Sequence, residues 1–73
     1  MDRRSVRSRS VASAGYDERS RTLEVEFTNG SIYRYLDVPV GVYAQLLSAD
    51  SVGRFLNQHI RDRYFYVRLP DHA

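Results

Sequence analysis

Two tyrosines enclose an arginine at Tyr33, Arg34 and Tyr35, and this triplet has the residue types that bind nucleic acids. Aromatic rings stack on unpaired bases, and guanidinium groups neutralise phosphates. Four more arginines follow in the second half of the chain. With the triplet they complete a predicted nucleic-acid surface of seven residues: Tyr33, Arg34, Tyr35, Arg54, Arg61, Arg63 and Arg68.

Catalytic and metal-binding chemistry find little support in the sequence. His59 falls on the apolar side of a predicted helix, which is typical of a packed histidine rather than of a general base. His72 lies in the C-terminal tail, and Glu24 and Glu26 share one face of a strand without a histidine beside them. No glycine-rich phosphate loop and no metal-spaced set of ligands occurs. The sequence therefore predicts a protein that is not an enzyme and that has no metal or other cofactor.

The residues before and within the triplet predict a β-hairpin. Leu23, Val25 and Phe27 alternate with polar residues, the turn pair Asn29-Gly30 follows, and β-forming residues resume after it. This combination is the strongest short-range signal for two antiparallel strands joined by a tight turn.

The length of the turn decides which side chains share a face of the hairpin. A two-residue turn would place Arg34 on the apolar face, where an unpaired charge is costly. A three-residue turn over 28–30 instead pairs Glu24 with Arg34, and we expect this register. Tyr33 and Tyr35 then lie on the apolar face as core residues, while Arg34 and Glu24 form an exposed pair on the other face. Because Arg34 points away from both tyrosines, the triplet does not act as one unit on a single face.

The remaining segments complete a predicted α+β fold in the order β-β-β-α-α-β. We expect a strand over 11–16, a helix from Pro39 to near Ala49, and a last strand over 64–69. A second helix is expected to be capped by Asp50 or Ser51. Its apolar stripe is the clearest helical pattern in the chain and consists of Val52, Phe55, Leu56, His59 and Ile60. The strands would form a small antiparallel meander of three or four strands, packed with the two short helices.

Length and composition favour a single small domain. The chain has 73 residues and a thin core, and we expect the domain over residues 10–69. Four arginines and three serines among the first ten residues predict a disordered basic arm over 1–9, and residues 70–73 are expected to form a loose tail. The absence of cysteine and of a long apolar run favours the cytoplasm, with no membrane partner. All eleven basic residues are arginine, which suits phosphate contacts but also follows from GC-rich codon usage.

Many of these features occur together in one known family. They are Gly15-Tyr16-Asp17, the strand Leu23-Glu24-Val25-Glu26-Phe27, Asn29-Gly30, Tyr33-Arg34-Tyr35, Asp37-Val38-Pro39, Tyr43, Ser51, Gly53, Phe55-Leu56-Asn57, Ile60-Arg61 and Tyr64. This ordered set resembles the KTSC domain family, which is named after the C-terminal extension of some lysyl-tRNA synthetases and is marked by a central Tyr-x-Tyr motif. The resemblance covers residues 10–69, and it implies a small domain for which RNA binding has been suggested.

The sequence leads to two hypotheses about function. The favoured one is a non-catalytic binding module that contacts single-stranded or structured RNA through exposed Arg and Tyr side chains. The alternative is a protein-interaction module that uses a sheet edge or a Tyr/Arg surface. A monomer is expected in either case.

Overall fold

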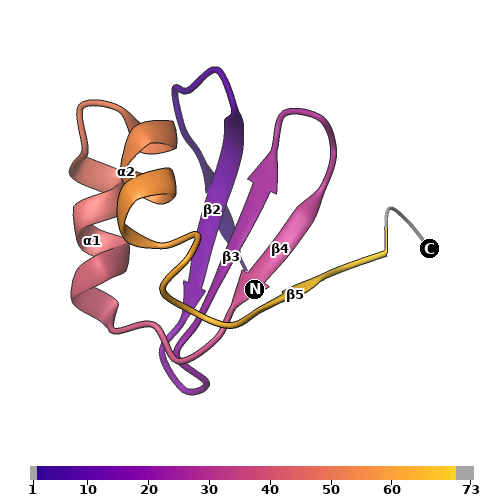
Figure 1. Ribbon diagram of the computed structural model, residues 1–73, viewed down its shortest axis with the longest axis vertical. Coiled ribbons are helices and arrows are strands. Elements are labelled where there is room, and N and C mark those ends of the chain that lie inside the picture. Colours follow the sequence, from indigo (N-terminus) through magenta and orange to yellow (C-terminus); the bar gives the residue numbers. More distant parts are fainter. Residues whose placement is uncertain (1, 71–73) are drawn as a thin grey trace.

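The computed structural model describes residues 2–70 and consists of an antiparallel five-stranded sheet with two helices on one side of it (Figure 1). The elements are β1 (Arg3–Ser5), β2 (Val11–Asp17), β3 (Thr22–Phe27), β4 (Ile32–Tyr35), α1 (Val40–Ser48), α2 (Val52–His59) and β5 (Tyr66–Arg68). Neighbouring strands follow the order of the chain, β1-β2-β3-β4-β5. The predicted α+β meander with two helices before its last strand is confirmed, and β1 adds a strand that the sequence did not predict.

The β3–β4 hairpin has the expected three-residue turn. Glu24 lies opposite Arg34, and Val25 lies opposite Tyr33. The Gly30 N–H donates to the carbonyl of Phe27 at 2.9 Å, and Gly30 has a φ of 93°. This left-handed conformation is one that glycine adopts without strain, so the turn and the register depend on this position.

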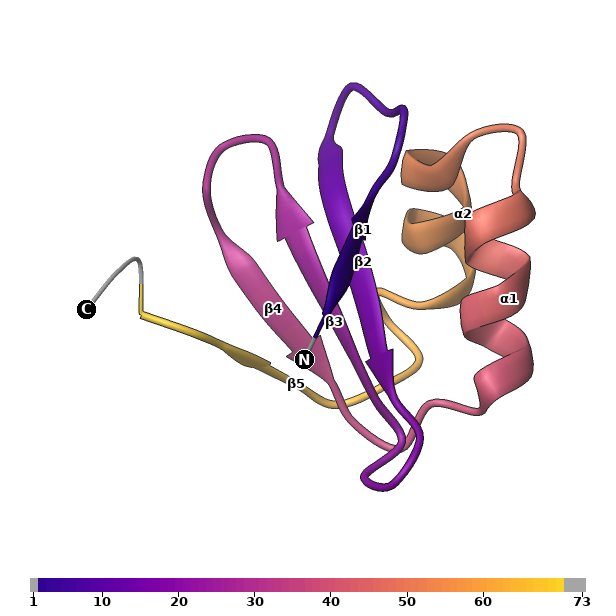
Figure 2. The ribbon, with the colours of Figure 1, turned by 180° about the vertical axis from the view of Figure 1, so that it is seen from behind.

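Residues 3–5 form β1 where the sequence predicts a disordered arm. β1 pairs with β2, and it runs beside β2 when the molecule is seen from behind (Figure 2). Arg3 lies opposite Gly15, where an added Cβ would come within 2.9 Å of the Arg3 Cγ. The bare glycine therefore leaves room for the arginine to cross β2, and its Nε reaches the Glu24 carboxylate at 3.4 Å. Strand pairing and an ion pair, rather than apolar burial, order this segment.

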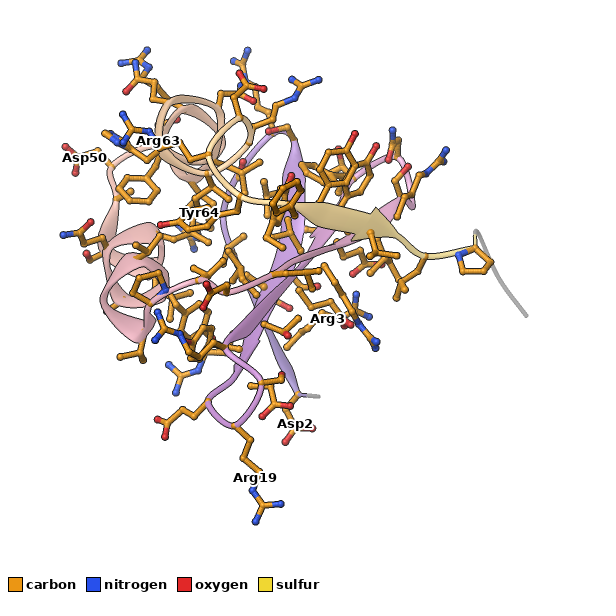
Figure 3. The ribbon with its side chains drawn as sticks, turned by 60° about the horizontal axis from the view of Figure 1, so that its bottom comes forward. Asp2, Arg3, Arg19, Asp50, Arg63 and Tyr64 are labelled. Carbon is orange, nitrogen blue, oxygen red and sulfur yellow. The ribbon has the colours of Figure 1, made fainter. Side chains whose placement is uncertain are left out.

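Glu24 is not the exposed partner that the sequence predicts. Its side chain is 8% exposed, because it lies between Arg3 at 3.4 Å and Arg34 Nε at 2.8 Å. Figure 3 shows Arg3 on the side of the sheet that faces away from α2. On the sheet face opposite the helices, the carboxylate of Glu24 in β3 thus contacts an arginine of β1 and an arginine of β4.

The two helices begin and end close to the predicted positions. Pro39 precedes α1, and Ser51 caps α2 by accepting a hydrogen bond at 3.2 Å from the Arg54 N–H. The core joins both layers and contains Val11, Ala14, Leu23, Val25, Tyr35, Val38, Leu46, Val52, Leu56 and Ile60. His59 was predicted to pack in or beside this core, but it is exposed at the end of α2, with its ring 4.7 Å from that of Phe55.

The chain returns to the sheet after α2 and adds β5 beside β4. The predicted strand over 64–69 is shorter in the structure, and the Leu69 N–H still donates to the carbonyl of Ile32 at 2.8 Å. Residues 71–73 of the predicted tail, including His72, lie outside the described residues, as does Met1.

Replacing Gly30 with valine tests the turn. A β-branched residue resists a positive φ, so Gly30→Val should lower the free energy of unfolding by more than about 1 kcal/mol. Open space surrounds an added Cβ at this position, so the cost is conformational rather than steric. Gly41→Ala in α1 is the matched control, because it also meets open space and should be neutral or slightly stabilising. Urea unfolding measures both, and an unchanged Gly30→Val would contradict the turn assignment.

Removing the Glu24 carboxylate tests whether its two ion pairs stabilise the fold. Glu24→Gln should lower the free energy of unfolding by about 1–3 kcal/mol, because the charged hydrogen bond from Arg34 and the ion pair with Arg3 are lost. The control is Asp37→Asn, which removes the exposed Arg21–Asp37 pair and should change stability by less than about 0.5 kcal/mol. Equal effects of the two substitutions would show that Glu24 has no special structural role.

Candidate nucleic-acid interface

A cleft of about 470 Å³ opens between α2 and the strands β4 and β5. Its most buried lining residues are Tyr35 and Leu56, which come from the sheet and from α2 respectively. One side of the cleft is aromatic, and the other carries polar side chains from the end of α2 and the residues after it. The cleft therefore lies on the face of the sheet that carries the helices, next to α2.

Four aromatic residues, which we call the aromatic wall, form the sheet side of the cleft: Phe27, Tyr33, Tyr35 and Tyr66. The Tyr33 ring centroid lies 5.1 Å from that of Tyr66 in a stacked arrangement, and 5.3 Å from that of Phe27 edge-on. Cross-strand pairing explains the wall, because Tyr66 of β5 lies directly opposite Tyr35 of β4. Tyr66 remains 54% exposed, so its ring is accessible from solvent.

Tyr35 is both a core residue and a lining residue. Only 1% of it is exposed, and within residues 2–70 its hydroxyl has no hydrogen-bond partner. Burial raises the pKa of Tyr35 to about 12, and the neighbouring Tyr33 acts in the same direction, while Arg61 opposes the rise. The phenol is therefore neutral at physiological pH and keeps a proton that it can donate.

The opposite side of the cleft is polar. Asn57, Arg61 and Asp62 line it. An Arg61 N–H donates to the Asn57 side-chain oxygen at 3.5 Å, so the side-chain N–H groups of Asn57 remain available as donors. The cleft thus presents a cation, an anion and an amide within reach of the aromatic wall.

A second hollow, which we call the basic hollow, adjoins the cleft. It has a volume of about 570 Å³ and shares Ser10, Gly53 and Asn57 with the cleft. Three arginines line it, Arg7, Arg9 and Arg54, against one carboxylate, Asp50. An aromatic site and a site of positive charge therefore lie side by side on one surface.

The structure separates the seven residues of the predicted surface. Tyr33, Tyr35 and Arg61 line the cleft, and Arg54 lines the basic hollow. Arg68 donates to the hydroxyl of Ser31, a lining residue, at 3.2 Å, which places it at the rim of the cleft.

Two of the seven residues lie elsewhere. Arg34 binds Glu24 on the opposite face of the sheet, as the register predicts. Arg63 lies beside the helices (Figure 3) and lines neither the cleft nor the basic hollow.

Sequence reasoning missed several lining residues. The main ones are Arg7, Arg9, Phe27, Asn57, Asp62 and Tyr66. For Tyr66 a signal existed, because it alternates with Arg68 on one face of the predicted last strand. Arg7 and Arg9 were assigned to a disordered arm, and only the packing of residues 7–10 near α2 reveals their position.

Two further observations concern residues 2–70 only. Within this part of the chain, no group of three or more His, Cys, Asp or Glu side chains is arranged to hold a metal ion. None of its helices has the length and apolarity needed to cross a bilayer.

Comparisons with known proteins place the chain among small bacterial proteins and one segment of a larger enzyme. The family model of the KTSC domain matches residues 7–64. An uncharacterized protein of Stutzerimonas stutzeri is 45% identical over 70 residues, which are 94% of this chain and 99% of the relative. A lysine–tRNA ligase of Nostoc punctiforme is 35% identical over 54 residues, which are 74% of this chain but 10% of the ligase. The crystal structure of a KTSC domain protein from Yersinia pestis superposes with a TM-score of 0.92 at 33% identity, over 94% of this chain and 97% of that one.

The buried phenol predicts a stability that depends on alkaline pH. The pKa of Tyr35 is about 12 in the folded chain against an ordinary value of 10.0, so between these pH values the unfolded chain has lost a proton that the folded chain keeps. The free energy of unfolding should therefore fall as the pH rises through this window. Tyr35→Phe removes the group, so its stability should fall less over the same range. Urea unfolding at neutral pH and across the window measures the difference, and parallel pH curves for the two proteins would argue against the raised pKa.

Proposed function

The chain belongs to the KTSC domain family, and we propose that it is a non-catalytic RNA-binding module that holds unpaired nucleotides along the cleft and the basic hollow. In this proposal the protein needs no cofactor and acts in the cytoplasm, in keeping with its lack of cysteine. Neither a metal nor a catalytic side chain takes part, because binding requires only stacking and charge.

The observation that carries the proposal is that the cleft, which the aromatic wall lines, adjoins the basic hollow and shares three lining residues with it. Base–aromatic stacking contributes about 1–3 kcal/mol per base, and it is tolerant of sequence because every base has a π-face. Arginines beside such a platform neutralise the phosphates that connect the bases. Asn57 lines both spaces, so a strand whose base entered the cleft would have its phosphates close to Arg9 and Arg54.

The relatives support the same class of partner. Lysine–tRNA ligases of Nostoc and Trichormus contain a segment that is 35–37% identical to this chain over 54 residues. Their name places such a segment in a protein that acts on a tRNA. This chain matches 10% of the ligase, so only the binding of RNA, and not the ligase reaction, is proposed for it.

A protein-interaction module is the second candidate, and exposed apolar residues near β5 favour it. Phe65 is 87% exposed, Val67 is 50% exposed, and Leu36 lies close to them, since its N–H donates to the Phe65 carbonyl at 2.8 Å. A partner protein would cover these side chains on binding. This surface is separate from the cleft, because none of the three residues lines it.

Titration with single-stranded RNA, followed residue by residue by NMR, separates the two candidates. Amide signals of Tyr33, Tyr35, Arg61 and Tyr66 should shift, and affinity should fall steeply between about 50 and 200 mM salt as counterions are released. A protein partner held by apolar contacts would bind with little dependence on salt over this range.

Two aromatic substitutions test whether RNA binds in the cleft. Tyr66→Ala should weaken RNA binding by about 1–3 kcal/mol, because a stacking ring is lost from the cleft. Phe65→Ala is the matched control, since it removes a neighbouring exposed ring outside the cleft and should leave the affinity unchanged. Signals that stay unmoved at low salt would exclude RNA as the partner.

A further inference from the structure

We propose that the cleft is a pocket for a single extruded nucleobase, and that the Tyr35 hydroxyl is the specificity-determining group that hydrogen-bonds the edge of this base. The inference rests on the proposed function and deepens it, because it names the part of the RNA that enters the cleft. The adjacent phosphates would lie in the basic hollow rather than in the cleft itself.

The shape and composition of the cleft suit a flat aromatic ligand. Its volume of about 470 Å³ lies within the range of about 300–1,000 Å³ that is typical of small-ligand sites. A base can stack against the ring of Tyr66, which is 54% exposed, whereas Tyr33 is half-buried between the rings of Tyr66 and Tyr35, and Tyr35 and Leu56 lie deeper. Stacked rings prefer centroid separations of about 4.5–7 Å, and the wall already shows this spacing within itself, at 5.1 Å between Tyr33 and Tyr66.

The Tyr35 hydroxyl is a donor at the cleft that forms no hydrogen bond within residues 2–70. Buried tyrosine hydroxyls normally form a hydrogen bond, and the Tyr16 hydroxyl does so by donating to the Val38 carbonyl. Tyr35 is more deeply buried than Tyr16, and its hydroxyl forms no hydrogen bond within residues 2–70; Arg3 Nη1 is the one fully enclosed side-chain atom without a partner in this part of the chain, so the Tyr35 hydroxyl is still reached from the cleft. A ligand that enters the cleft can accept a hydrogen bond from it, and because the nucleobases carry their acceptor nitrogens and oxygens at different positions, the hydroxyl would favour some bases over others.

The charges in the cleft favour a base over a phosphate. Asp62 lines the cleft together with Arg61, so an anion placed there would meet a carboxylate. The edge of a base carries donors and acceptors side by side, and these match the carboxylate of Asp62 and the guanidinium of Arg61. The basic hollow has three arginines against the single Asp50 and is the better site for the backbone phosphates.

The test uses synthetic RNA heptamers in which one central base, A, C, G or U, is flanked by abasic sugar-phosphate units, and a fully abasic heptamer of equal charge. At low salt the wild-type protein should bind the best of the four bases at least about tenfold more tightly than the abasic strand. Tyr35→Phe, which keeps the ring, should reduce both this ratio and the preference among bases by about fivefold or more. Binding of the abasic strand should not change. Tyr43→Phe, a half-buried tyrosine outside the cleft, is the control and should bind as the wild type does.

The outcomes separate the inference from the proposed function. If the protein binds ordinary single-stranded RNA but does not distinguish base-containing from abasic heptamers, the base pocket is wrong and RNA binding stands. If the base is distinguished but Tyr35→Phe changes neither ratio nor preference, the role of the hydroxyl is overturned. If neither ordinary RNA nor any heptamer binds at low salt, the proposed function fails, and the inference fails with it.

Discussion

The left-handed backbone at Gly30 fixes the register of the β3–β4 hairpin, and the rest of the structure depends on this register. It directs Leu23, Val25 and Tyr35 toward the helices and pairs Glu24 with Arg34 on the other face. β5 follows this register, because its Tyr66 lies opposite Tyr35 of β4. A slip by one residue would bury a guanidinium and remove the tyrosines from the cleft, so the core and the candidate site share a single determinant.

The core and the candidate site also share residues. Tyr35 packs against both layers with its ring while its hydroxyl lies at the cleft, and Leu56 of α2 likewise contributes to both. A chain of 73 residues has few side chains to spare, and here residues of the core also form one side of the candidate site. Rings that are held by packing are already ordered, so a ligand that stacked on them would cause little further loss of conformational freedom.

The elements that could be predicted from the sequence are those that depend on residues close together in the chain. The hairpin, the Ser51 cap and the start of α1 after Pro39 follow from neighbouring residues, and each is confirmed. β1 could not be predicted in this way, because its order depends on Glu24 and Gly15, which lie far from Arg3 in the sequence.

The candidate site was predictable in part for the same reason. Tyr33 and Tyr35 stand out by type and spacing, whereas Asn57 and Asp62 acquire a role only when α2 is placed against the sheet. The separation of Arg34 from the tyrosines did follow from strand alternation alone. Only the three-dimensional structure shows that Arg7 and Arg9 line the basic hollow.

The two edges of the sheet have a consequence for the behaviour of the protein at high concentration. Both edge strands, β1 and β5, contain three residues, and each carries at least one arginine. Open edges offer unpaired backbone groups to other chains, and short, charged edges reduce this hazard. The long and more apolar strands β2 and β3 lie inside the sheet, with a neighbour on either side. The arrangement therefore protects the most aggregation-prone segments of the chain from amyloid-like pairing.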